Sequence, residues 1–528
     1  MKTIKLILSF LLINVLAVSN AQSNTPAFDI SWDKNQEPFK DGYINNMKIL
    51  KADKEFIYYY LNTYKVTFGA SYYHFLVKYD RQTSEYKWLD ITPKADKNKL
   101  SYLTYDTINN GFHFFSYFHN KAQKKLYIFD ETFDYEKLSS NNDIKKISEI
   151  DLTDKGSLLD NMFLVSNNGR YLFRYSCVSN KGHFYGLEVF NKKLEREWGT
   201  FSMAMTEKGY NIESKYKIDN EGNVFAIQRN FEKQNDVGTH FDRSRIWAVC
   251  YPKDGSEPHS LALILKNDLF ITAEQLSLNK KNQVICAGLY ARPGTESAVG
   301  CFSFIIEPLL AKINSITTNE FSNELITKGA DSKKKNADVK KIVEKKDFEK
   351  NFGYDFNDIH FRTDEGFDLV AEKYYSVTVT SKNSSTTFHY YDDLWVLNFN
   401  SDGSMKWVQK IPKYEYVIDQ YSKIGSYYLY RDKNEELNFI FNIANNKIVF
   451  PLYKHYSTTV KIKLDKDGNE AFNELINDND ISNAFVPAYS FTEDNANIIL
   501  TRSNSLKSLY PVSGKHNFFN FGELKLKY

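Results

Sequence analysis

Short apolar stretches separated by polar turns extend along almost the whole chain. Residues 218–228, IDNEGNVFAIQ, show the repeating unit: one apolar stretch ends at Ile218, a polar turn covers 219–223, and a second apolar stretch begins at Val224. Gly and Asn tolerate the positive φ that tight hairpin turns require, while Val, Phe and Ile favour a pleated, half-buried strand. The segment therefore predicts two antiparallel strands joined by a tight turn.

The same turn recurs along the chain, and each copy is followed by an apolar, β-branched or aromatic run. The copies lie at 52–55, 108–111, 166–169, 219–223, 279–282, 362–366, 431–435 and 492–495.

A second kind of turn follows each of these by about two strands. In its clearest case Asn400 opens the turn, Gly403 closes it, and Trp407 comes four residues later. We expect each outgoing strand to place its aromatic ring in the core. Residues 191–198 keep this spacing without the glycine, 465–472 keep it with Phe as the aromatic residue, and looser copies lie at 80–88, 130–137 and 253–255.

Two alternating turns at a spacing of about 60 residues predict an all-β protein built as a single β-propeller, with four-stranded sheets around an axis. The repeats favour eight blades. Seven blades with a separate N-terminal hairpin is the alternative, because one misread turn changes the count. The last unit holds three strands, at 486–491, 497–502 and 518–528. A strand near Ile30 would complete that blade, so we expect the ring to be closed by an N-terminal strand.

Residues 1–21 are interpreted as a secretory signal peptide and residues 22–528 as the propeller. Lys2 and Lys5 supply the positive start, an apolar run follows, and Ala21 ends a small-residue cleavage site. A membrane anchor is the alternative, but the apolar run is short for a span. No Cys follows that run, which excludes a lipid-modified N-terminal Cys, and no later segment is long and apolar enough to cross a bilayer. We expect an exported protein that is periplasmic, outer-membrane-associated or extracellular.

Charge and composition narrow the classes of partner. The chain carries 68 Lys and Arg against 66 Asp and Glu, a formal net charge of +2, so the charge balance does not favour nucleic acid. An aromatic content of 16%, with 37 Tyr and 40 Phe, suits a strand-rich chain.

Two segments interrupt the β pattern. A Lys-rich insertion at 328–350 has a weak helical stripe, which predicts a mobile loop with a short helix. A solvated insertion is the first expectation, and an anion-binding or surface-binding arm is the alternative. Polar residues at 381–387 predict a hairpin tip between two long strands.

The four cysteines, Cys177, Cys250, Cys286 and Cys301, are too few and too scattered for a disulfide framework. Cys286 and Cys301 lie symmetrically about 293–294, so we expect them nearly opposite each other on neighbouring antiparallel strands. Export permits a bridge there, but directly paired strands strain its geometry. Two buried free thiols are the first expectation and a Cys286–Cys301 disulfide is the alternative.

Four segments carry a resemblance to a known group of proteins: 366–375 (GFDLVAEKYY), 390–396 (YYDDLWV), 403–413 and 519–528. They are similar to uncharacterised exported, β-propeller-like proteins of Gram-negative bacteria. The resemblance implies a propeller in the cell envelope or outside the cell, and it brings no catalytic residues with it. Residues 403–407 are also distantly similar to the turn and tryptophan of quinoprotein-like and WD40-like repeats. Trp occupies this position in only some units, so no quinone cofactor is expected.

No pattern in the sequence predicts a catalytic, cofactor-binding or metal-binding residue. His113 and His119 come nearest to a metal pair, but they lack the clustered Cys or His partners of a metal site. Residues 465–468 are too short for a calcium loop and lack its distal Glu, and the sequence has no G-x-S-x-G turn. The acid pairs 392–393 and 364–365 are interpreted as turn residues rather than as catalytic carboxylates.

Paired tyrosines recur at 58–60, 72–73, 374–375, 390–391 and 427–428. Each pair would put one ring on each face of its strand. Packing between blades is the first expectation, and a groove that stacks sugars or peptide is the alternative.

The sequence favours an exported, non-enzymatic β-propeller that serves as a protein-binding or scaffolding module of the bacterial cell envelope. Other envelope proteins are the expected partners, a glycan is the alternative partner, and no cofactor is expected. A broad rigid disc with loops on two faces suits protein contacts. The second hypothesis is an envelope enzyme that processes glycans or peptides at the mouth of the central channel. Convergent carboxylates or an Arg-Tyr-Glu group at one mouth would favour the enzyme, and an apolar patch on one face would favour binding.

Overall fold

Strands account for nearly all of the regular structure, as the alternating pattern predicts. The fold is seen in a computed structural model of the chain. It describes residues 28–32, 43–66, 70–95, 98–107, 111–140, 144–152, 157–179, 182–203, 205–206, 209–231, 244–293, 298–307, 309, 311–328, 350–380, 385–418, 425–445, 456–478, 484–493, 497–503 and 519–526.

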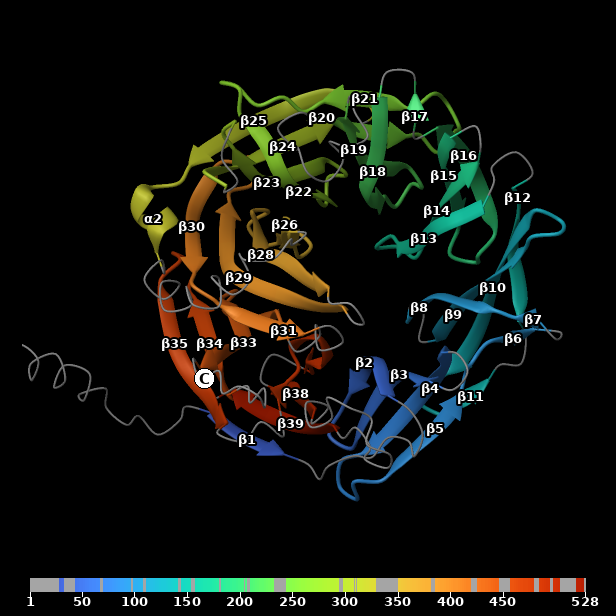
Figure 1. Ribbon diagram of the computed structural model, residues 1–528, viewed down its shortest axis with the longest axis horizontal. Coiled ribbons are helices and arrows are strands. Elements are labelled where there is room, and N and C mark those ends of the chain that lie inside the picture. Colours follow the sequence, from blue (N-terminus) through green and yellow to red (C-terminus); the bar gives the residue numbers. More distant parts are fainter. Residues whose placement is uncertain are drawn as a thin grey trace, which may run out of the picture.

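The described strands form eight sheets of four to six strands, which stand as blades around a central axis (Figure 1). Blade 1 contains β2 (Tyr43–Ala52), β3 (Phe56–Val66), β4 (Ala70–Asp80) and β5 (Tyr86–Asp90). Blade 2 contains β8 (Ser101–Asp106), β9 (Phe112–Asn120), β10 (Lys125–Asp134), β11 (Ser139–Ser140) and β12 (Lys145–Asp151), and the small pair β6 (Lys94–Ala95) and β7 (Asn98–Lys99) precedes it. Blade 3 contains β13 (Ser157–Val165), β14 (Tyr171–Ser179), β15 (Gly182–Phe190) and β16 (Arg196–Met203). Blade 4 contains β17 (Met205–Thr206), β18 (Gly209–Ile218), β19 (Val224–Phe231), β20 (Ser244–Tyr251) and β21 (His259–Ala262).

The second half of the ring is built in the same way. Blade 5 contains β22 (Phe270–Leu278), β23 (Val284–Ala291), β24 (Gly300–Glu307) and β25 (Lys312–Glu320). Blade 6 contains β26 (Lys350–Phe356), β27 (His360–Phe361), β28 (Phe367–Thr380), β29 (Ser385–Phe399), β30 (Met405–Ile411) and β31 (Glu415–Ile418), and the short helix α2 (Asn323–Thr327) precedes it. Blade 7 contains β32 (Tyr427–Arg431), β33 (Leu437–Asn445), β34 (Tyr456–Leu464) and β35 (Glu470–Asp478). Blade 8 contains β36 (Ala484–Phe485), the 3-10 turn η6 (Pro487–Tyr489), β37 (Phe491–Thr492), β38 (Asn497–Ser503), β39 (Phe519–Leu526) and β1 (Phe28–Trp32).

The prediction of an all-β propeller with eight blades is confirmed, and the alternative count of seven is wrong. In the last blade β1 pairs antiparallel with β39, from Phe28 opposite Leu526 to Trp32 opposite Gly522. The Trp32 ring lies beneath the Arg502 guanidinium, whose central carbon is 3.6 Å from the ring centroid. This pairing joins segments almost 500 residues apart in sequence. We expect it to hold the ring closed.

Buried apolar side chains form eight clusters among the described residues, and each cluster joins two neighbouring blades; the cluster between blades 8 and 1 also includes Val417 of blade 6. The period of two along a strand explains this arrangement, because successive residues point to opposite faces of the sheet. Tyr59 therefore packs toward blade 8 and Tyr60 toward blade 2. Both rings are buried, which agrees with the expectation that the Tyr58–Tyr60 run packs between blades.

Each blade presents its first and third connections on one face of the ring, because successive strands run in opposite directions. We call this the tight-turn face; it carries the turns 53–55, 81–85, 166–170, 191–195, 219–223, 252–258, 279–283, 362–366, 400–404, 432–436 and 465–469. We call the opposite face the long-connection face, since the second connections and the links between blades lie there.

Asp219 shows why these turns are short and polar. Its Oδ1 accepts hydrogen bonds from the backbone N–H groups of Glu221, Gly222 and Asn223 at 2.9, 2.8 and 2.8 Å. Gly222 has φ +98°, a conformation that other residues adopt only with strain. The tight turn predicted at 219–223 is confirmed.

The prediction that the aromatic residues after the second kind of turn enter the core is wrong for Trp88 and Phe472, whereas Trp198 and Trp407 pack against the edges of inter-blade clusters. Trp88 and Phe472 are 52% and 53% exposed. Trp198 and Trp407 are half-buried, and each indole N–H donates to a backbone carbonyl in a turn of the next blade, at 3.0 and 2.9 Å. All four residues lie on the outermost strands of their blades, where a ring is covered in part, as for Trp198 and Trp407, or left exposed, as for Trp88 and Phe472.

The register of blade 5 corrects the expectation for the cysteines. Cys286 lies opposite Phe304, and Cys301 lies opposite Leu289. The offset is an odd number of residues, which turns the two side chains to opposite faces of the sheet. Cys286 therefore packs toward blade 4 and Cys301 toward blade 6, and all four cysteines are buried free thiols.

Several sequence predictions concern segments outside the described residues. The signal peptide at 1–21, most of the Lys-rich insertion at 328–350 and residues 381–384 of the hairpin tip predicted at 381–387 belong to this group; residues 385–387 are part of β29. At the insertion's edge, α2 ends at Thr327, and the Lys328 Nζ lies 3.1 Å from the Glu470 Oε2. Among the described residues, no helix is long and apolar enough to cross a membrane.

Candidate functional site

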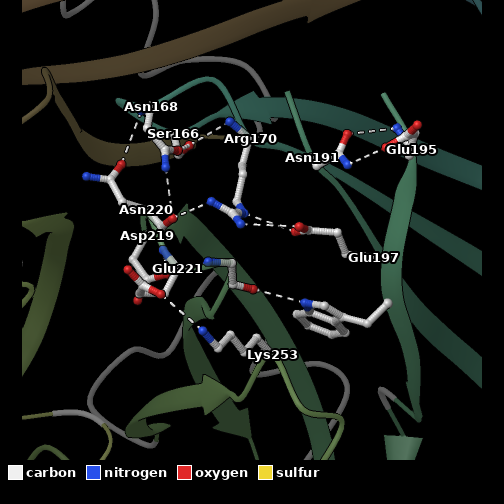
Figure 2. A network of polar contacts seen from close by, with 12 residues as sticks. Ser166, Asn168, Arg170, Asn191, Glu195, Glu197, Asp219, Asn220, Glu221 and Lys253 are labelled. Atoms are coloured by element: carbon white, nitrogen blue, oxygen red, sulfur yellow. Dashed lines mark hydrogen bonds and ion pairs between the residues drawn. The ribbon is translucent and has the colours of Figure 1, made fainter. Parts of the chain in front are cut away.

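The tight-turn face is cross-linked between blades by its own polar side chains (Figure 2). Asn168 of blade 3 donates from its backbone and side-chain nitrogens to Asn220 of blade 4, at 3.1 and 2.9 Å. Arg170 donates to the Asn220 carbonyl and forms a two-pronged ion pair with Glu197, at 3.0 and 3.2 Å. Lys253 extends the network to Glu221 at 3.0 Å. Through these hydrogen bonds the turn side chains of blade 3 hold the neighbouring turn of blade 4 in place.

The long-connection face holds a different arrangement at the ends of blades 1 and 2. β3 and β4 each run for 11 residues, so their ends carry side chains beyond the inter-blade core. Register pairs Tyr64 with Tyr72 and Asn62 with His74, which places all four side chains on the face of the sheet turned toward blade 2. Tyr102 of β8 approaches from blade 2, with its ring centroid 4.9 Å from that of His74.

We call these residues, together with Tyr60 and Asn45, the tyrosine–asparagine site. Tyr72 is 48% exposed and Tyr102 is 36% exposed, so both side chains are partly open to solvent. The hydroxyl of Tyr102 hydrogen-bonds with Tyr60 and Thr104, and burial raises its pKa. The hydrogen bonds of its hydroxyl group therefore fix the orientation of the Tyr102 ring.

A β-bulge supplies the polar group of this site. Register between β2 and β3 passes from Ile44 opposite Thr63 to Asn46 opposite Asn62, which leaves Asn45 without a partner residue on β3. Such a bulge redirects a side chain. The Asn45 amide donates to the buried Asn62 Oδ1. Asn62 in turn donates to the Tyr73 carbonyl at 3.0 Å, so the orientation of the exposed Asn45 is set by a chain of hydrogen bonds.

His74 forms the floor of the tyrosine–asparagine site. The Tyr60 hydroxyl lies 2.7 Å from its Nδ1, and its backbone N–H donates to the Thr92 hydroxyl at 3.0 Å. Burial lowers the pKa of His74 to about 4, so the imidazole is neutral at physiological pH. A neutral, buried imidazole and two hydroxyls make a floor that is rigid and uncharged.

A second group of side chains lies on the inner side of blade 6, where β31 pairs with β29 (Figure 1). The Lys413 Nζ lies 2.7 Å from the Glu372 Oε1 and 2.9 Å from the Glu415 Oε2. The Ser426 hydroxyl donates to the Glu372 Oε2 at 2.6 Å, and the Ser426 backbone N–H donates to Glu415 at 3.1 Å. We call these four residues the carboxylate–lysine cluster.

Burial controls the charges of the carboxylate–lysine cluster. The side chains of Lys413, Glu372 and Glu415 are 0%, 3% and 6% exposed. Burial alone would lower the pKa of Lys413, but the adjacent Glu415 and Glu372 raise it above its usual value. Burial raises the pKa of Glu415 to about 7, against the opposing effect of Lys413. A carboxyl that titrates near neutral pH can act as a general acid or base.

One carboxylate next to this cluster is exposed. Asp355 of the inner strand β26 lies directly opposite Glu372 of β28, so the two side chains share one face of the sheet. Tyr374 and Tyr391 stand beside them, with ring centroids 5.3 Å apart. The long β28–β29 hairpin, which extends toward the axis in Figure 1, therefore brings three carboxylates and two tyrosines together.

The structure places the candidate residues of the sequence analysis as follows. His113 and His119 both lie on β9 six residues apart, about 20 Å along a strand, so they cannot share a metal ion. His113 instead lies 3.1 Å from the Asp130 Oδ1, and this hydrogen bond raises its pKa. No group of three or more His, Cys, Asp and Glu side chains suited to a metal ion occurs among the described residues.

The two acid pairs behave differently. Asp364 lies in a turn, as predicted, and accepts a hydrogen bond from the Gly366 N–H at 2.9 Å. Asp392 and Asp393 lie within β29 and are buried, so their interpretation as turn residues is wrong. The Asp393 carboxylate lies 3.0 Å from the Lys410 Nζ of the next strand. The Lys410 cation compensates the buried charge of Asp393 within the strand.

Sequence reasoning missed most of the residues in both sites. The contacts of Glu372 with Lys413 and Ser426 join residues 41 and 54 positions apart, and the sequence around them has no local signature of this proximity. Asn45 had a usable signal, because the adjacent pair Asn45 and Asn46 breaks the alternation of strand 43–52 where a bulge forms.

An apolar cavity of about 10 Å³ lies between blades 4 and 5. Its lining includes Phe225, Cys250, His259, Leu276 and Ile306. This volume is at the lower limit for one water molecule, so the cavity is a packing defect rather than a ligand site.

No family model matches the chain, and no curated protein matches it. The solved structures that match include the polysaccharide lyase Uly1, with 9% identity, 94% of this chain and 92% of that chain covered, and a TM-score of 0.37. The β-propeller domain of the Trilobed protease from Pyrococcus furiosus has 10% identity, with 82% and 95% covered and a TM-score of 0.31. An α-L-arabinanase of Penicillium chrysogenum has 9% identity, with 72% and 98% covered and a TM-score of 0.31. Similarities of this size carry no argument about the activity of this chain.

Proposed function

We propose that this chain is an exported, non-enzymatic β-propeller that serves as a binding or scaffolding module of the bacterial cell envelope. The observation that carries the proposal is the tyrosine–asparagine site. There Tyr72 and Tyr102 are exposed, Tyr72 lies beside the Tyr64 ring, and hydrogen bonds with Tyr60 and Thr104 fix the Tyr102 ring. Rigid aromatic side chains give a large contact area at a low cost in conformational entropy, which is why binding surfaces are rich in them.

The position of the site supports the same proposal. The tight-turn face is occupied by contacts between blades, whereas the tyrosine–asparagine site lies on the long-connection face. The eight inter-blade clusters make the ring a rigid support, so a partner would not have to order it on binding. Residues 1–21 resemble a signal peptide, which supports an envelope component as the partner. The near-neutral charge balance gives no support for nucleic acid as the partner.

Site-specific photo-crosslinking tests this proposal. A photo-reactive amino acid is placed at Tyr72, and in a control protein at Trp88, which is equally exposed but lies on the outermost strand of blade 1. We expect adducts with an envelope component at Tyr72 and none at Trp88, and we expect Tyr102→Ala to weaken them. Equal labelling at both positions, or none at Tyr72, would contradict a binding role for this site.

A glycan- or peptide-processing enzyme is the second candidate function. It is favoured by the carboxylate–lysine cluster, where Glu415 has a pKa of about 7 and lies close to Glu372 and the exposed Asp355. The test is hydrolysis of envelope glycans and peptides by the wild type and by Glu415→Gln. A rate that falls in the variant and depends on a group titrating near pH 7 would support the enzyme. A rate that is unchanged in Glu415→Gln would remove this candidate.

A further inference from the structure

The tyrosine–asparagine site combines two features that a sugar ring requires. A pyranose presents a face of C–H groups, which pack on an aromatic ring, and a rim of hydroxyl groups, which pair with a group that both donates and accepts hydrogen bonds. Tyr72 and Tyr102 supply exposed aromatic surface. The Asn45 amide supplies the donor and the acceptor.

The hydrogen bonds of Asn45 leave it free to bind a ligand. One N–H of its amide is used by Asn62, and its carbonyl oxygen accepts no hydrogen bond from the part of the chain that the structure describes. The amide is already oriented, because Asn62 is buried and held by the Tyr73 carbonyl. A ligand that binds an oriented amide avoids the entropic cost of fixing it.

The chemistry of the site favours a sugar over a charged segment of protein. Its aromatic, amide and hydroxyl groups are uncharged, and burial keeps the His74 imidazole neutral. Charged side chains lie around these groups rather than among them: Asp90 of β5 lies opposite Phe75 and acts on the His74 imidazole, and Lys48 of β2 lies opposite Tyr60. The aromatic pair Tyr64–Tyr72 and the ring of Tyr102 extend the surface across the junction of two blades, which suits an elongated ligand.

We infer that the tyrosine–asparagine site binds a glycan chain, with sugar rings packed on Tyr72 and Tyr102 and a pair of sugar hydroxyls bound to the Asn45 amide. This inference rests on the proposed binding function and names its ligand class. A peptide or protein segment is the competing occupant, and the experiment below separates the two.

The test uses the mature full-length protein and isothermal titration calorimetry with soluble hexasaccharides of glucose, xylose, mannose and N-acetylglucosamine. We expect at least one hexasaccharide to bind. Tyr102→Ala and Asn45→Ala should each weaken that binding by about tenfold, since each removes roughly 1.4 kcal/mol of stacking or hydrogen bonding. Tyr72→Phe, which keeps the ring, should bind like the wild type. The control Trp88→Ala should also bind like the wild type. Thermal unfolding of every variant confirms that it is folded.

The outcomes distinguish the inference from the function on which it rests. If no hexasaccharide binds but a partner protein does, and Tyr102→Ala weakens the protein complex, the glycan inference is wrong and the binding function stands. If hexasaccharides bind equally to Tyr102→Ala, Asn45→Ala and wild type, the sugar site lies elsewhere and the inference is overturned. If neither class of ligand binds, the binding function fails as well.

Discussion

Replacing Lys413 by Met tests how much the carboxylate–lysine cluster contributes to the junction between blades 6 and 7. The ammonium lies 2.7 Å from Glu372 and 2.9 Å from Glu415, and all three side chains are buried. Met has a similar volume, so packing is retained while two buried carboxylates lose their cation. Removing one member of a buried ion pair costs about 3–5 kcal/mol, because the remaining charge is left uncompensated. We expect a loss of that size in the free energy of unfolding at about pH 8.

The pH dependence gives this prediction its sign. The pKa of Glu415 is about 7 in the folded state against a reference value of 4.5, so the folded state binds more protons between these values. The contribution of Glu415 to stability is therefore greatest below about pH 4.5, and it is lost as the pH rises through 7. Without Lys413 burial acts unopposed, and the folded-state pKa of Glu415 rises further. The deficit of the variant relative to the wild type should therefore be smaller at about pH 6 than at about pH 8.

Urea unfolding followed by tryptophan fluorescence measures the free energies, and hydrogen exchange of β31 and β32 reports whether the loss is local. The matched control is Lys281→Met, which removes an inter-blade ion pair to Glu365 at 2.6 Å between side chains that are 63% and 52% exposed. An exposed pair contributes at most about 1 kcal/mol. The reasoning is refuted if Lys413→Met unfolds with the same free energy as the control, or if its deficit grows as the pH falls.

Three further predictions concern the ring itself. Trp32→Ala should reduce the free energy of unfolding by about 3 kcal/mol, because it removes apolar contacts and the cation–π contact with Arg502. It should also accelerate hydrogen exchange in β39, and unchanged exchange would mean that β1 does not hold the ring closed. Gly222→Ala should lower the urea midpoint of unfolding by an amount equivalent to about 1 kcal/mol. The added Cβ would have no atom closer than 3.4 Å, so the cost comes from the backbone φ of +98°. An unchanged midpoint would show that the Asp219 turn relaxes. A thiol reagent should modify no cysteine in the native protein and all four after denaturation, because burial raises the pKa of thiols such as Cys286; fewer than four after denaturation would reveal a disulfide.

The sequence was informative wherever local chemistry decides structure. The turn 219–223 was predictable because an Asp at its start and a Gly near its end satisfy the backbone of any tight hairpin, whatever surrounds it. Repetition of such turns sufficed for the propeller and for its eight blades. The single strand 28–32 was predictable as the partner of 519–526 because the last repeat is one strand short, and the observed pairing has that arrangement.

Features that depend on register or on distant segments could not be predicted in this way. The symmetry of Cys286 and Cys301 about a loop predicts that they lie opposite each other, but the observed register differs by an odd number of residues and separates them into two cores. Trp88 was assigned to the core from turn spacing alone, which does not say how far from the axis a strand lies. The contact of Glu372 with Lys413 spans 41 residues and a link without periodicity, so nothing in either segment indicated it.

The eight shared clusters affect how the protein tolerates damage. Neighbouring residues of one central strand, such as Leu369 and Val370, belong to different seams of the ring. A blade therefore cannot unfold without exposing apolar surface on both of its faces. Each of its two neighbours would also expose the apolar face that packed against it. We expect loss of structure to spread around the circle once it starts, so that the assembly melts as a unit rather than shedding single sheets.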